Sequence, residues 1–153
     1  MMNLASEVIC ALQGKTLVTA ESCTGGMIGA ALTAVSGASQ VYKGGVISYT
    51  NEVKQNVLGV DEQLLHMYGA VSQQTAGAMA SGVRKLLKAD YAVSVTGLAG
   101  PGGDEFGHEV GTVFIGFESV HGCIVKQYHF PGNREEVREQ TVQASLRLIL
   151  ENN

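Results

Sequence analysis

The stretch LVTAESCTGGMIGAALTAV (residues 17–35) decides the fold, because within a few residues it changes from a strand pattern to a helix pattern. LVTA (17–20) is a short apolar run typical of a buried strand. ESCTGG (21–26) interrupts it, and residues 27–35 continue with small and apolar residues at helical spacing. A buried strand followed at once by a helix is the repeating unit of α/β folds.

The same alternation continues on both sides of this stretch. Helices are predicted at 3–13, at 51–58, after Ser72 and after Asn133, where Glu136 completes a capping-box pattern. Strands are predicted at 46–50, 91–96, 111–119 and 123–130, the last two joined as a hairpin through residues 120–122. We therefore expect a single α/β domain over residues 1–153. It should be a layered α/β/α structure with a mixed, mostly parallel sheet and a C-terminal hairpin plus helix.

Glycine is over-represented in this chain. It accounts for 20 of 153 residues, close to twice the average usage of about 7%. The glycines follow no three-residue period and lie among 45% hydrophobic residues, which excludes collagen and low-complexity linkers. They are therefore expected in turns and in loops where a ligand approaches the backbone.

Charge and cysteine content exclude several classes of protein. The net charge is −4, which gives no support for nucleic-acid binding. No apolar stretch approaches the length of a membrane span, and four histidines without ligand spacing predict no metal site. Three cysteines without a CxxC pair and no signal-peptide pattern favour the cytoplasm. A homo-oligomer, most simply a dimer, is the base-rate expectation.

Three segments combine glycine with polar side chains just after a predicted strand or within one. They are ESCTGG (21–26), KGGVISYTNEVK (43–54) and VTGLAGPGG (95–103). In α/β sheets, ligands bind outside the carboxyl ends of the strands. All three segments are therefore candidates for one shared site.

ESCTGG has two interpretations. Ser22 or Thr24 can simply cap the following helix, which is the commoner role for these residues. Alternatively, Ser22 is a nucleophile, and helix N–H groups near Gly25 and Gly26 hold an anion. Cys23 could be an activated thiol, but a small packing cysteine is the more common case.

The middle segment offers a base for a serine that has no histidine partner. A neutral lysine can fill that role, and Lys54 follows Tyr49 by five residues. Tyr49 could orient the lysine or relay the proton. The competing interpretation places Lys54 on a solvated helix face and Tyr49 in the core.

VTGLAGPGG matches neither a P-loop nor a dinucleotide fingerprint. Its glycines form either a wide turn or a backbone nest for an anion, and composition does not separate the two.

Together these segments resemble the CinA C-terminal family, whose stand-alone members include nicotinamide-nucleotide amidohydrolases. The resemblance extends in order from about residue 4 to residue 150. It rests on the stretches TAESCTGG (19–26), GGVISYTNEVK (44–54), VTGLAGPGG (95–103), VGTV (110–113) and FPGNR (130–134).

The resemblance implies hydrolysis of the carboxamide of nicotinamide mononucleotide to nicotinate mononucleotide and ammonia, without a cofactor. It implies that Ser22 is the nucleophile and that Tyr49 and Lys54 handle protons. The substrate-binding residues that it implies come from all three segments and from FPGNR: Thr24, Gly25, Gly26, Gly45, Thr96, Gly97, Ala99, Gly100 and, for the phosphate, Arg134.

One position departs from the family pattern, because His108-Glu109 stands where the family often has Lys-Pro. The alternative function is a non-catalytic nucleotide-binding or regulatory module that uses the same glycine loops. A role in DNA competence is suggested only by the family name, and the acidic charge does not support it.

Overall fold

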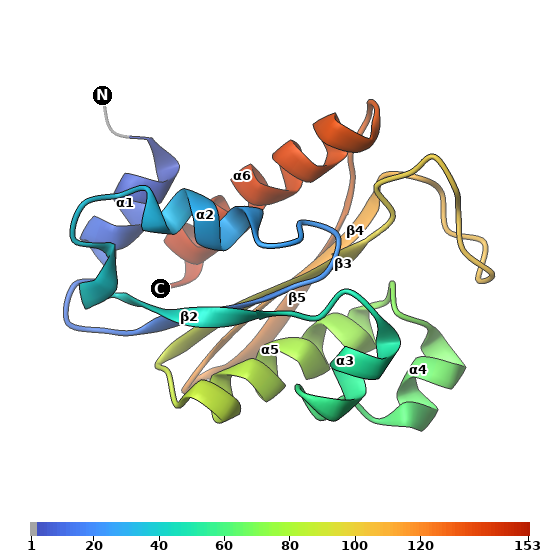
Figure 1. The fold of residues 1–153 in the computed structure, drawn as a ribbon, viewed down its shortest axis with the longest axis horizontal. Coiled ribbons are helices and arrows are strands. Elements are labelled where there is room, and N and C mark those ends of the chain that lie inside the picture. The colour runs from blue at the N-terminus through green and yellow to red at the C-terminus, as the bar shows by residue number, and fades with distance from the viewer. Residues whose placement is uncertain (1–2) are drawn as a thin grey trace.

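A central five-stranded sheet organises the molecule, in a computed structural model that describes residues 3–153 (Figure 1). The strand order is β2-β1-β3-β4-β5. The strands are β1 (Leu17–Glu21), β2 (Tyr42–Ile47), β3 (Tyr91–Gly97), β4 (Thr112–Ser119) and β5 (Gly122–His129).

The sheet is mixed, as predicted. β1 pairs in parallel with both β2 and β3, whereas β3–β4 and β4–β5 are antiparallel. Only β4 therefore runs against the other four strands. β1 is buried along its whole length, which explains its continuous apolar pattern. The hairpin of β4 and β5 is also confirmed.

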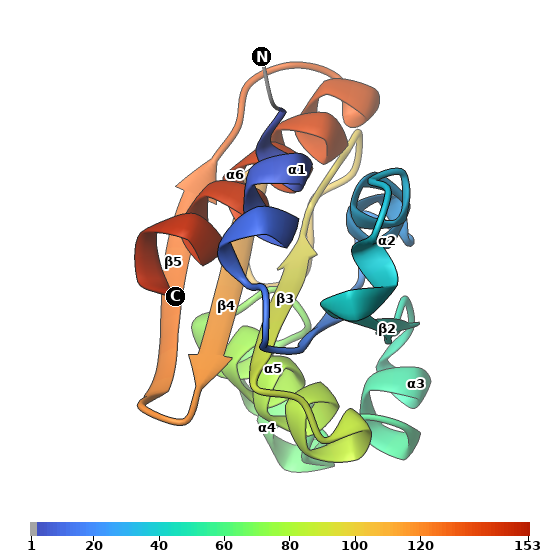
Figure 2. The same cartoon turned by 90° about the vertical axis from the view of Figure 1, so that its left-hand side faces the viewer.

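Helices cover both faces of the sheet (Figures 1 and 2). On one face lie α1 (Leu4–Ala11), α2 (Met27–Thr33) and α6 (Arg134–Asn152). On the other lie α3 (Asn51–Asn56), α4 (Glu62–Tyr68) and α5 (Gln73–Leu87). A short 3-10 helix, Ala38–Gln40, precedes β2. The layered α/β/α class is thus confirmed. None of the helices in residues 3–153 is both long and apolar enough to span a membrane.

The helix caps follow the sequence signals closely. The Ser72 side chain accepts from the Thr75 N–H at the start of α5. Asn133 and Glu136 form the complete capping box of α6. These local hydrogen bonds satisfy N–H groups that a helix leaves unpaired, so the motif fixes the start of each helix.

Two elements differ from the prediction. β2 covers residues 42–47 rather than 46–50, because it is an edge strand whose glycines, Gly44 and Gly45, lie inside the ladder. Helix α4 was not predicted. Asp61 caps it by accepting from the Gln63 N–H, and with only seven residues it shows little periodicity.

The topology places three connections at one end of the sheet. Ser22 follows β1, Ser48 follows β2 and Leu98 follows β3, and these three parallel strands end at the same edge. The glycine-rich segments found in the sequence therefore meet in space.

Candidate active site

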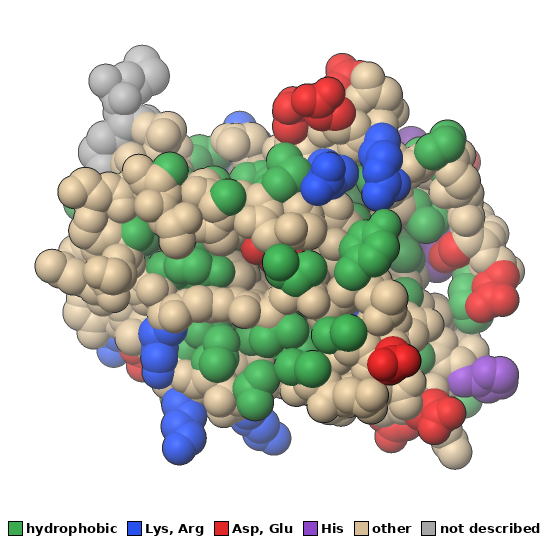
Figure 3. Space-filling view, in the orientation of Figure 1, with side chains coloured by type: hydrophobic (Ala, Val, Ile, Leu, Met, Phe, Trp, Pro, Cys, Tyr) green, Lys and Arg blue, Asp and Glu red, His purple; other side chains and the backbone are tan. Residues whose placement is uncertain are grey.

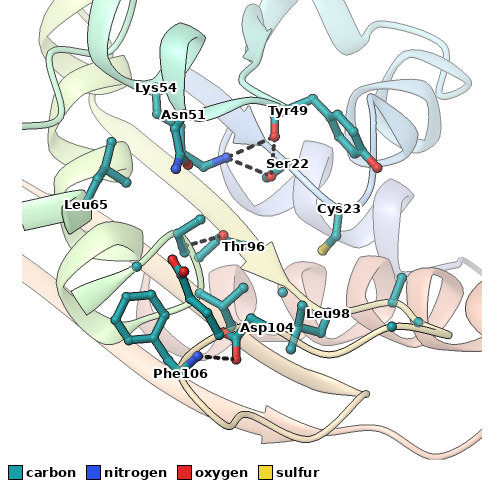
Figure 4. Close-up of a pocket in the computed structure, with 18 of the residues that line it drawn as sticks. Ser22, Cys23, Tyr49, Asn51, Lys54, Leu65, Thr96, Leu98, Asp104 and Phe106 are labelled. Carbon is teal, nitrogen blue, oxygen red and sulfur yellow. Dashed lines mark hydrogen bonds between the residues drawn. The ribbon is translucent and has the colours of Figure 1, made fainter. Parts of the chain in front are cut away.

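Ser22 and Lys54 form a direct pair at this edge of the sheet. They are 32 residues apart in sequence, and Lys54 Nζ lies 3.0 Å from Ser22 Oγ (Figure 4). Ser22 is in the turn after β1, and Lys54 is in the short helix α3 after β2. A serine within hydrogen-bond distance of a lysine amine is the geometry of a nucleophile and its base.

Lys54 is almost fully buried, with 1% of its surface exposed. Its amine also donates to two backbone carbonyls, Ser48 O at 2.8 Å and Tyr49 O at 3.2 Å. Burial lowers the pKa of Lys54 from 10.5 to about 8. In the neutral amine, the two carbonyls accept both N–H groups, and the lone pair is then left for the Ser22 hydroxyl proton.

Two hydrogen bonds, one local and one between strands, help to place Lys54 there. The Thr50 side chain caps α3 by accepting from the Val53 N–H. The Ser48 N–H donates to Glu21 O at 2.7 Å, which ties the end of β2 to the end of β1. The lysine therefore reaches the serine because two adjacent parallel strands end together. The surface-lysine interpretation of Lys54 is excluded by its burial.

The Glu21 carboxylate organises the ESCTGG turn. Glu21 is 2% exposed. Its Oε1 accepts from Thr24 Oγ1 at 2.6 Å and from the Ile28 N–H at 2.9 Å, and its Oε2 accepts from the Gly29 N–H at 3.0 Å. The first N–H groups of α2 are therefore occupied by a side chain of the protein itself.

This arrangement corrects the expectation of an anion site at Thr24, Gly25 and Gly26. The Gly26 N–H also points to Glu21, at 3.2 Å, and the Gly25 N–H donates to Ser22 O. None of these three residues lines the cavity. Thr24 is fully buried and holds Glu21, so its hydroxyl has a structural partner.

A cavity of about 530 Å³ opens beside the Ser22–Lys54 pair. That volume is in the range of small-molecule sites. Among the predicted site residues, the cavity is lined by Ser22, Tyr49, Lys54, Thr96, Gly97, Ala99, Gly100 and Arg134.

Gly45 does not reach this cavity, contrary to the prediction. A Cβ at this position would collide with Thr19 of the neighbouring strand. The hydroxyls of Thr19 and Tyr42 form a 2.7 Å hydrogen bond beside it. Gly45 is therefore needed for strand packing.

Tyr49 contacts Lys54 through its backbone and not through its hydroxyl. Its side chain is on the outer side of the cavity, pointing away from Lys54, and the residue is 58% exposed (Figure 4). The hydroxyl accepts from Arg134 Nη2 at 3.3 Å, and Arg134 Nη1 donates to Gly100 O at 2.8 Å. Arg134 thus joins two walls of the cavity.

Cys23 also lines the cavity, but its thiol is poorly suited to nucleophilic chemistry. Burial raises the pKa of Cys23 to about 11. The thiol is therefore protonated at neutral pH, whereas the thiolate is the reactive form. The interpretation of Cys23 as a packing residue agrees with this environment.

Several cavity residues were not predicted: Asn51, Leu65, Gly69, Ala70, Val71, Leu98, Gly102, Asp104, Glu105 and Phe106. Asn51, Leu98 and Gly102 lie within the segments already singled out, so proximity in sequence was a usable signal. Gly69 to Val71 lie after α4, the helix that the sequence pattern did not reveal.

Solved structures share this fold closely. A competence damage-inducible protein A from Klebsiella pneumoniae is 38% identical with a TM-score of 0.95, and the match covers 97% of this chain and 94% of that chain. A CinA superfamily protein from Escherichia coli is 34% identical with a TM-score of 0.95, and the match covers 97% and 88% of the two chains.

Curated relatives are longer proteins. A CinA-like protein of Prochlorococcus marinus strain MIT 9313 is 46% identical over 157 residues, which covers 97% of this chain and 37% of the relative. Another, from strain MIT 9301, is 44% identical and is covered to 34%. The chain thus spans about a third of the length of these relatives. Residues 2–152 match the family described as the CinA C-terminal domain, and the chain belongs to that family.

Proposed function

We propose that the chain is an amidohydrolase that converts the carboxamide of nicotinamide mononucleotide to the carboxylate and releases ammonia. The observation that carries this proposal is the 3.0 Å contact between Ser22 Oγ and a buried Lys54 amine. A lysine is rarely buried without a reason, since removing its charge from water is costly. A lowered pKa next to a nucleophile and a cavity is typical of functional sites.

In the first half of the reaction, Ser22 Oγ attacks the carboxamide carbon while the neutral Lys54 amine accepts the hydroxyl proton. The tetrahedral intermediate then collapses, and the Lys54 ammonium returns this proton to the departing NH₂ group, which leaves as ammonia. In the second half, Lys54 deprotonates a water that attacks the acyl-serine ester. The Lys54 ammonium returns the proton to Ser22 Oγ, and the carboxylic acid product loses its own proton to solvent and leaves as the carboxylate.

The oxyanion of the intermediate needs hydrogen-bond donors near Ser22. In residues 3–153, the backbone N–H groups of Cys23 and Ala99 donate to no other residue, and both residues line the cavity. We assign them as the donors, in place of the N–H groups of Gly25 and Gly26, which are already bound. One such donor contributes about 3–4 kcal/mol to the stabilisation of a transition state.

Arg134 is the best candidate for the phosphate. Its guanidinium lines the cavity, and its two contacts, with Gly100 O and the Tyr49 hydroxyl, are to uncharged groups. A guanidinium matches a phosphate with two parallel hydrogen bonds. The positive charge is therefore still available for an anionic ligand.

The test is release of ammonia from nicotinamide mononucleotide by the purified protein. Ser22→Ala and Lys54→Met should each lower the rate by a factor of about 10³ or more. The matched controls are Ser39→Ala and Lys126→Met, at exposed positions away from the cavity. Turnover near the wild-type rate in either site variant would rule out the proposed pair. Nucleotide binding without any ammonia would favour the regulatory-module alternative.

A further inference from the structure

The loop that connects β3 to β4 forms one wall of the cavity and carries only acidic charge. Residues 98–111 include Asp104, Glu105 and Glu109 but neither lysine nor arginine. Asp104 and Glu105 line the cavity. Figure 3 shows acidic side chains at the right of the view, where Figure 1 places this loop.

Phe106 places an aromatic ring in the same wall. It lines the cavity and stays 40% exposed. Its ring rests on the bare backbone of Gly69, where an added Cβ would lie 2.6 Å from a ring carbon. Gly69 also has φ +81°, a conformation that favours glycine. The ring therefore packs against Gly69 and remains accessible from the cavity.

Asp104 holds this part of the loop in shape. Its carboxylate accepts from the backbone N–H groups of Phe106 at 3.1 Å and of His108 at 3.0 Å, and it lies 2.6 Å from His108 Nδ1. Burial raises the pKa of Asp104, but the hydrogen bonds from His108 and Phe106 outweigh it, and the net pKa is lowered. Asp104 therefore stays ionised at neutral pH. Its hydrogen bond to the Phe106 N–H holds the backbone from which the Phe106 ring projects.

The cavity is consequently polarised. The Arg134 guanidinium is beside the Tyr49 hydroxyl. The rings of Tyr49 and Phe106 lie on opposite sides of the Ser22 hydroxyl (Figure 4). The Arg134 guanidinium thus lines one part of the cavity, and Asp104, Glu105 and the Phe106 ring line another. Such a cavity suits a ligand with an anionic group at one end and a cation at the other.

We propose that Phe106 and Glu105 recognise a positively charged aromatic ring, so that the site selects pyridinium amides over uncharged ones. The aromatic face attracts a cation placed over it, and a nearby carboxylate adds Coulomb attraction. This inference rests on the proposed function, in which the amide-bearing ring is a pyridinium. It adds the residues that discriminate ring charge.

The test compares two ligands that differ in ring charge, nicotinamide mononucleotide and its reduced dihydropyridine form. Calorimetric titration of the Ser22→Ala variant measures binding without turnover. The cationic ligand should bind roughly ten-fold more tightly than the reduced one. Phe106→Leu and Glu105→Gln, each added to Ser22→Ala, should lower this preference about three- to five-fold. Glu109→Gln is the matched control, because Glu109 is on the same loop but its side chain is 81% exposed and outside the cavity.

Equal affinities for the two ligands, no binding of either, or an unchanged preference in both Phe106→Leu and Glu105→Gln would each overturn the proposal. Its failure can be separated from failure of the proposed function. If the wild-type protein releases ammonia from both forms at equal kcat/KM, the hydrolase stands and the charge selection falls. If the cationic ligand is preferred in binding but no ammonia forms, the charge selection stands and the hydrolase falls.

Discussion

At the scale of single residues, the Lys54 amine determines how the site responds to pH. With a pKa of about 8, Lys54 is neutral in about one molecule in ten at pH 7. Deprotonating the lysine at this pH therefore costs about 1.4 kcal/mol. Because the neutral form is the proposed base, kcat/KM for ammonia release should rise with pH and level off above about 8. Lys54→Arg should lose activity at every pH, since a guanidinium stays protonated. A profile that is flat from about pH 6 to pH 9 would contradict this assignment.

Tyr49 should affect substrate binding more than proton transfer. Its hydroxyl contacts Arg134 and not Lys54, whereas its carbonyl, which any residue supplies, contacts the lysine. Tyr49→Phe is therefore expected to raise KM about three- to ten-fold, the effect of losing one ordinary hydrogen bond, with kcat close to the wild-type value. Steady-state kinetics over a range of pH check this expectation. A fall in kcat of about 100-fold with an altered pH profile would instead support a proton relay through the hydroxyl.

At the scale of secondary-structure elements, the ESCTGG turn depends on Glu21. Its buried carboxylate binds three N–H groups at the start of α2 and the Thr24 hydroxyl. Glu21→Gln removes the charge and turns one acceptor into a donor, so the free energy of unfolding should fall by about 2–3 kcal/mol. Urea denaturation measures the loss. Glu7→Gln, in the first turn of α1 and exposed, is the matched control and should change stability by less than about 0.5 kcal/mol. Equal stabilities of the two variants would show that the carboxylate is not needed.

The same turn shows which features of the fold and the site are predictable from the sequence and which are not. Periodicity and capping signals are local, so β1, α2 and the capping box at Asn133 were predictable from neighbouring residues. The contact between Ser22 and Lys54 joins residues 32 positions apart, and only the pairing of β1 with β2 creates it. Helical N–H groups near Gly25 and Gly26 were expected to be free for a ligand. Instead, the Gly25 N–H donates to Ser22 O, and the Glu21 carboxylate accepts from the N–H groups that follow, because a buried carboxylate needs several donors.

At the scale of the whole molecule, the sheet brings the segments of the site together, and the loops after its strands supply the residues that line the cavity. Three parallel strands bring the ends of β1, β2 and β3 together, and the two helix layers shield them. The segments after β1 and β2 supply Ser22 and Lys54, and the loop after β3 supplies the wall with Asp104 and Glu105. Burying Lys54 within this frame lowers its pKa, as the proposed base requires, but opposes folding, because the unfolded chain keeps the lysine protonated and hydrated.

This opposition predicts a pH dependence of global stability. Above pH 8 the folded protein releases the Lys54 proton, whereas the unfolded chain, with a pKa of 10.5, still holds it. The unfolded state then binds more protons, so stability rises with pH in this window. Lys54→Met lacks the effect. The wild-type free energy of unfolding, measured relative to that of Lys54→Met, should therefore increase by about 2–3 kcal/mol from about pH 7 to pH 10. Taking the difference between the two proteins removes the titration of the tyrosines and cysteines that they share. A difference that stays constant with pH would mean that Lys54 keeps an ordinary pKa in the folded protein, and the base assigned to Ser22 would then be wrong.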